Sequence, residues 1–168
     1  MPSKLKMLNF AIKGLKTVEE IIALANDKFN VAAFLLHSGY FNDAYYLGGY
    51  AFELLLKAKI CKTLEITDLF DFDNAKNRKL PVAPGKKAEK ENLYRSFKVH
   101  DYEQLLILSG LYHKFYLNIL NDAKFNQDWM YIHTWDENVR YSTNHEREEV
   151  ENFINAIKNM MLWLQQWL

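Results

Sequence analysis

The sequence predicts an all-α protein, an up-and-down helical bundle of about five helices. The 168 residues contain only six glycines and three prolines, too few for the many turns of a β-sandwich. Apolar residues recur along most of the chain with the helical period of about 3.6. Hydrophobic residues make up 49% of the chain, which excludes wholesale disorder. The length suits a single domain covering residues 1–168.

The first helix has recognisable signals at both ends. Thr17 and Glu20 have the spacing of a capping box, in which each side chain binds the other's backbone N–H. Gly39 is a typical helix-ending residue. We therefore expect a helix over residues 17–38.

A second helix is predicted over residues 43–64. The short turn before it predicts an antiparallel hairpin with the first helix. Gly48 and Gly49 lie in its middle, where each glycine costs about 1 kcal/mol relative to alanine. We expect a neighbouring helix to approach closely there, because glycine lacks a side chain.

Residues 66–98 interrupt the helical pattern and predict a long basic loop between the second and third helices. Residues 74–98 contain eight basic and two acidic residues, and residues 1–16 contain four lysines and no acidic residue. The two stretches carry a net charge of +10, while the whole chain is formally neutral. They could contact a polyanion such as RNA. The alternative is a lysine-rich tail and a loop kept in solution by charge.

The second half of the chain continues the helical pattern. A third helix is expected to begin at Ser96 or Asp101. A fourth helical region covers 112–134, with a bend near residues 121–126, and residues 136–142 read as a turn.

The last helix is predicted to begin at a second capping box, with Thr143 as the N-cap and Glu146 three residues later. Its apolar stripe includes Val150 and continues to the end of the chain. Trp163 and Trp167 lie beside this stripe, and we expect them to face a partner chain, as in a homodimer.

Several familiar chemical motifs are absent. The chain has no glycine-rich phosphate loop, no G-x-S-x-G elbow and no H-E-x-x-H motif, so we expect no cofactor. His100 and Asp101 are adjacent, as in metal phosphohydrolases, but a metal site needs further ligands at matching spacing. The other histidines do not have this spacing: His37, His113, His133 and His145. We therefore expect no metal, and we interpret Asp101 as a helix cap.

The second helix carries a polar face, distinct from its apolar stripe. Tyr46, Tyr50, Glu53 and Lys57 follow one another at intervals of four, three and four residues. The face is either the ordinary edge of an amphipathic helix or a partly buried stripe lining a groove. In the second case Glu53 could bind an arginine.

Arg140 and His145 form an R-x4-H pattern at the predicted start of the last helix. Both could reach the free N–H groups of that helix end, which favour phosphate. A histidine can act as general base on a ribose 2′-hydroxyl, and an arginine can stabilise a pentavalent phosphate. The pattern also arises by chance, and four glutamates between residues 146 and 151 oppose RNA binding.

Taken together, these residues resemble the HEPN superfamily of "higher eukaryotes and prokaryotes nucleotide-binding" domains. The similar segments are FNDAYYLGGYAFELLLKAKICKTL (41–64), KVHDYEQLL (98–106) and WDENVRYS (135–142). The likeness spans about residues 17–168 and implies a helical bundle that is often dimeric.

The resemblance implies a nucleotide- or RNA-interacting protein of a prokaryotic defence or toxin–antitoxin type. One version is a metal-independent RNase with Arg140 and His145 as catalytic residues. The alternatives are a non-catalytic module acting with a nucleotidyltransferase partner, and a helical protein-interaction domain. Tyr141 stands where the RNase motif usually has a polar residue, which favours a branch of the family with a poorly defined function. The candidate binding residues are Tyr50, Glu53, Lys57, His100, Asp101 and Tyr141.

The expected location is the cytoplasm. Cys61 is the only cysteine, so no disulfide can form within the chain. The first residues lack the apolar core of a signal peptide, and no apolar run is long enough to span a membrane.

Overall fold

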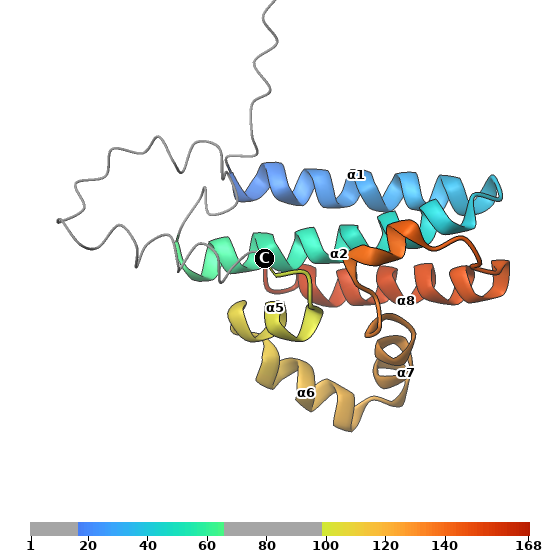
Figure 1. Ribbon diagram of the computed structural model, residues 1–168. Helices are drawn as coiled ribbons and strands as arrows, with labels where there is room; N and C mark the ends of the chain where they lie inside the picture. Colours follow the sequence, from blue (N-terminus) through green and yellow to red (C-terminus); the bar gives the residue numbers. More distant parts are fainter. Residues whose placement is uncertain (1–16, 66–98) are drawn as a thin grey trace, which may run out of the picture.

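The computed structural model describes residues 17–65 and 99–168, and this part of the chain is helical with no strand (Figure 1). The predicted loop at 66–98 and the basic residues 1–16 lie outside the described residues. The elements are α1 (Val18–His37), α2 (Phe41–Thr63), α5 (Tyr102–Leu108), α6 (Tyr112–Asn121), α7 (Ala123–Ile132), the 3-10 helix η1 (Glu137–Tyr141) and α8 (Arg147–Gln165). The all-α bundle predicted from the sequence is confirmed.

The two ends of α1 confirm the signals in the sequence. Glu20 N–H donates to Thr17 Oγ1 and Thr17 N–H donates to Glu20 Oε2, both at 3.1 Å, which closes the capping box. At the other end Gly39 has a φ of +85°, and Tyr40 N–H donates to the carbonyl of Leu35. This is a Schellman ending, in which a glycine in the left-handed region satisfies the last carbonyls. It turns the chain directly into α2, which forms the predicted hairpin with α1.

Helix α2 is the centre of the bundle. It packs against α1, α8, α5 and η1, and Figure 1 shows α1 and α8 on either side of it, with α5, α6 and α7 below. Four neighbours leave little of α2 in contact with solvent, and every residue from 51 to 56 is buried. One of these is a glutamate, Glu53, which becomes the centre of the site described below.

Gly48 and Gly49 are packed against their surroundings, as expected. A Cβ atom at Gly48 would lie 2.5 Å from Ile154 Cδ1 of α8, so the prediction of a close helix is confirmed there. A Cβ atom at Gly49 would lie 2.2 Å from the indole Nε1 of Trp135, in the turn before η1. The second glycine therefore makes room for an aromatic ring and not for a helix.

The predicted third and fourth helical regions are present in altered form. Helix α5 begins at the second of the two predicted positions, because Asp101 Oδ1 accepts the N–H of Gln104. The expected bend in the fourth region is a complete break at Asp122, whose side chain accepts the N–H groups of Lys124 and Phe125. The result is two helices, α6 and α7.

The prediction that Thr143 caps the last helix is wrong. The N-cap is Glu146, with Glu149 at the third helical position, so His145 precedes the helix. His145 N–H donates to Asn42 Oδ1, and its ring stacks on Tyr45 at 4.1 Å between centroids. These contacts with α2 keep residue 145 outside the helix. The tertiary contacts of His145 thus override the local preference for a cap at Thr143.

The expectation that Trp163 faces a partner chain is also wrong. Its side chain is buried inside the domain, where it packs edge-on against Phe115 and Phe125. Trp167 is half-buried, and Lys114 Nζ lies 3.6 Å above its ring. These contacts belong to the fold of one chain, so a homodimer stays a prediction.

The buried Tyr102 predicts a loss of stability at alkaline pH. Its hydroxyl donates to the carbonyl of Gly49 at 2.8 Å, and burial, followed by the charge of Glu53, raises its pKa well above the usual value. Tyrosines of the unfolded chain ionise near pH 10, while Tyr102 keeps its proton in the fold. Deprotonation therefore favours the unfolded state, and the free energy of unfolding should fall as the pH rises above about 10.

Urea unfolding between about pH 8 and 11 tests this expectation. Tyr102→Phe should cost about 1 kcal/mol at the lower pH, because the hydrogen bond is lost. Its stability should then decline less steeply with pH than that of the wild type. Tyr116→Phe, at an exposed position of α6, is the control. Parallel curves for the wild type and Tyr102→Phe would contradict the prediction.

No helix within the described ranges combines the length and the apolar character that crossing a bilayer requires.

Candidate functional site

A buried carboxylate on α2 is the centre of the candidate site. Glu53 is an acidic side chain with no solvent exposure. Its Oε1 atom accepts a hydrogen bond from Lys57 Nζ, one turn later on the same helix. His100 Nδ1, just before α5, lies 3.0 Å from Oε1 and 3.1 Å from Oε2. The charge of Glu53 is thus compensated from two elements, which a buried charge requires.

The contacts continue from His100 towards the surface. Its second ring nitrogen, Nε2, lies 2.9 Å from Glu137 Oε2, at the start of η1. The same Oε2 atom lies 3.9 Å from Arg140 Nη2, one turn further along η1. We name this series of side chains the α2–η1 relay: Lys57, Glu53, His100, Glu137 and Arg140. It joins the buried interior of the bundle to an exposed arginine.

Tyrosine side chains lie on both sides of the relay. Tyr50 is half-buried on α2, with its ring parallel to that of Tyr46 at 6.2 Å between centroids. Burial, together with the charge of Glu53, raises the pKa of Tyr50. Tyr141 is different, since 74% of its surface is exposed. The guanidinium of Arg140 lies 5.1 Å from the centre of the Tyr141 ring.

Asp101 does not belong to the relay. Its carboxylate caps α5 through a 2.7 Å hydrogen bond from Gln104 N–H, as the simpler interpretation of the His100–Asp101 pair predicted. The cap fixes the start of α5 and thereby the position of His100 immediately before it.

His145 occupies a different place on α2. Its ring stacks on Tyr45, its Nδ1 atom lies 3.0 Å from Glu149 Oε1, and only 13% of its side chain is exposed. Its Nε2 atom is buried and has no hydrogen-bond partner among the described residues. Tyr45 precedes Glu53 by eight residues, which corresponds to about 12 Å along the helix axis.

The structure therefore divides the predicted site residues into groups. Glu53, Lys57 and His100 are in direct contact, and Glu137 links them to Arg140. The carboxylate beside Arg140 is Glu137 and not Glu53, the residue that the sequence suggested could bind an arginine. His145 has partners of its own, Tyr45 and Glu149.

Two residues that position the site were missed from the sequence. Glu137 stands three residues before Arg140, a spacing that places both on one face of a helical turn. That spacing could have drawn attention to it. Trp135 packs on Gly49 and stacks on Tyr102 at 5.2 Å, which fixes the segment leading into η1. The glycine pair in α2 signalled a close neighbour but not its identity.

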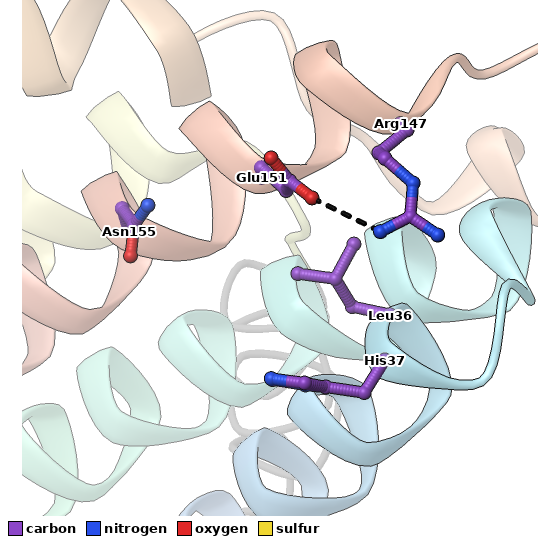
Figure 2. Close-up of a pocket in the computed structure, with 5 residues that line it drawn as sticks. All are labelled: Leu36, His37, Arg147, Glu151 and Asn155. Atoms are coloured by element: carbon purple, nitrogen blue, oxygen red, sulfur yellow. Dashed lines mark hydrogen bonds and ion pairs between the residues drawn. The ribbon is translucent and has the colours of Figure 1, made fainter.

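A small pocket lies apart from the relay, between the end of α1 and the first turns of α8 (Figure 2). It measures about 240 Å³ and contains none of the predicted site residues. Figure 2 shows Leu36 and His37 on one side and the Arg147–Glu151 ion pair on the other, joined at 3.3 Å. Arg147 and Glu151 are both largely exposed, so the pocket is an open surface depression.

Within the described part of the chain, no three histidine, cysteine, aspartate or glutamate side chains lie close enough to hold a metal ion.

Comparison with known proteins identifies no relative of this chain. No protein family matches the chain, and neither the curated proteins nor the solved structures include a significant match.

Proposed function

We propose that this chain is a nucleotide- or RNA-binding helical domain, and that the surface beside η1 binds its ligand. The observation that carries the proposal is the pair formed by Arg140 and Tyr141. An exposed aromatic ring beside an exposed guanidinium provides a stacking surface for a base and a partner for a phosphate. The HEPN-like motifs at 98–106 and 135–142 support the same proposal, because they contain His100 and Arg140.

The order of residues in the chain also supports a polyanionic ligand. Arg95 and Lys98 precede His100 by five and two residues. Both basic residues thus belong to the stretch of sequence directly before His100, and they lie outside the described residues.

Binding without cleavage fits the geometry better than the RNase interpretation does. A general base must reach the proton that it removes. His145 has one ring nitrogen engaged by Glu149 and the other buried. Catalysis by Arg140 and His145 would first require His145 to be uncovered.

Fluorescence anisotropy with a labelled single-stranded RNA tests the proposal. Tyr141→Ala should weaken binding about 5- to 150-fold, the range for loss of one stacked base. Arg140→Gln should make the dependence of log K on log salt shallower by about 0.7, because one phosphate contact is lost. Both residues are exposed, so the melting temperature should change little.

The chain offers matched controls for both variants. Tyr116 is an exposed tyrosine on α6, and Arg147 is an exposed arginine on α8. Tyr116→Ala and Arg147→Gln should bind as the wild type does. Equal losses in the control and test variants, or no binding by the wild type, would refute the proposal.

The same RNA, incubated with the protein and a chelator and analysed on a gel, tests the RNase alternative. Products ending in a 2′,3′-cyclic phosphate, formed by the wild type and lost in His145→Ala, would replace the binding proposal by an RNase. Uncut RNA that still binds would favour the binding domain.

A further inference from the structure

The carboxylate of Glu137 stands between two basic side chains, His100 and Arg140. Its Oε2 atom lies 2.9 Å from His100 Nε2 and 3.9 Å from Arg140 Nη2. Glu137 is therefore in closer contact with the histidine, although the arginine is its nearer neighbour along the chain. Arg140 has no other carboxylate within 4.0 Å in the described ranges.

The two ring nitrogens of His100 face different carboxylates. Nδ1 lies within hydrogen-bond distance of both Glu53 oxygens, and Nε2 lies 2.9 Å from Glu137 Oε2. The ring therefore spans the space between α2 and η1, beside the Glu137 oxygen that Arg140 could also approach.

The charged groups that surround His100 come from two elements. Glu53 and Lys57 approach from α2, and Glu137 and Arg140 approach from η1. Glu53 is buried and held by Lys57, so it cannot move away. Glu137 has a 40% exposed side chain and is free to rotate. Replacing His100 therefore acts on Glu137.

Arg140 is the alternative partner of Glu137. The two residues are three apart in η1, and a small rotation would close a charge-assisted hydrogen bond between them. That bond would occupy the guanidinium donors that a phosphate uses. With Glu137 held by His100, those donors stay available.

We propose that His100 is a positioning residue that holds Glu137 away from Arg140, and so keeps the guanidinium free for a phosphate of the ligand. Without the contact to His100, Glu137 moves to Arg140 and competes with the phosphate. The consequence for the ligand rests on the proposed function, whereas the exchange of Glu137 is a property of the chain alone and is tested without RNA.

The rate at which phenylglyoxal modifies Arg140, followed by mass spectrometry of the digested protein, reports how free the guanidinium is. His100→Gln should slow the modification about 3-fold, the size expected from one exposed ion pair. Glu137→Gln should not slow it, and His100→Gln should have no further effect in that background. Arg147, measured in the same digest, should be unchanged in every variant.

The outcomes separate this inference from the proposed function. If His100→Gln slows the modification of Arg140 but the wild type does not bind RNA, the binding function is refuted and the exchange of Glu137 is supported. If RNA binding depends on Arg140 but His100→Gln leaves the modification rate unchanged, the inference is overturned and the binding function is supported. An equal effect of His100→Gln with and without Glu137 would also overturn it, since His100 would then act by another route.

Discussion

Glu53→Ala is expected to lower the free energy of unfolding by about 3–5 kcal/mol, the range for removing one partner of a buried ion pair. Glu53 has no solvent exposure, and its carboxylate is in contact with both Lys57 and His100. The variant removes the carboxylate that both side chains contact and leaves a void beside α2. Urea denaturation at neutral pH, followed by circular dichroism, measures the loss.

The control for this prediction is Glu151→Ala. Glu151 also forms an i,i+4 pair, with Arg147 of α8, but both side chains are largely exposed. Its loss should cost less than about 1 kcal/mol, because exposed pairs contribute little. If Glu53→Ala and Glu151→Ala destabilise the protein to the same degree, the α2–η1 relay does not stabilise the fold.

Gly49→Ala should destabilise the protein by about 2 kcal/mol, within the range for overpacking a core. The new Cβ atom would lie 2.2–2.4 Å from three atoms of the Trp135 ring. That ring is stacked on Tyr102 with an interplanar angle of 6°, so it cannot move without disturbing its neighbour. The collision outweighs the gain of about 1 kcal/mol that alanine brings to a helix.

Gly48→Ala is the matched control on the same helix. Its Cβ atom would meet chiefly Ile154 Cδ1, at 2.5 Å, the far end of a flexible side chain. A rotamer change of Ile154 relieves this contact, and the higher helix propensity of alanine offsets much of the remaining cost. Thermal and urea unfolding should therefore place Gly48→Ala well above Gly49→Ala in stability. The reverse order would show that α8, and not Trp135, limits the packing of α2.

The fold was largely predictable because its signals are local. The capping box at Thr17 and the glycine at position 39 define α1 through hydrogen bonds between residues at most five apart. The start of the last helix was predicted incorrectly for the opposite reason. Thr143 and Glu146 match the local pattern, but Asn42 and Tyr45 of α2 hold His145 outside the helix.

Only the local contacts of the candidate site were predictable from the sequence. Glu53 and Lys57 form a pair one turn apart, and their contact follows from helical spacing alone. His100 reaches Glu53 across 47 positions in the sequence, and no periodic pattern reports such a contact. The roles of Glu137 and Trp135 depend in the same way on where the turn before α8 packs against α2.

The sequence by itself determined that this protein is helical and where its first two helices meet. Those properties depend on apolar spacing, caps and glycines, which act within a few residues of one another. Only the tertiary structure decided which charges meet. Burial of α2 on several sides leaves Glu53 without water, and a buried carboxylate needs compensating partners. The fold supplies Lys57 and His100, and through Glu137 it connects them to Arg140.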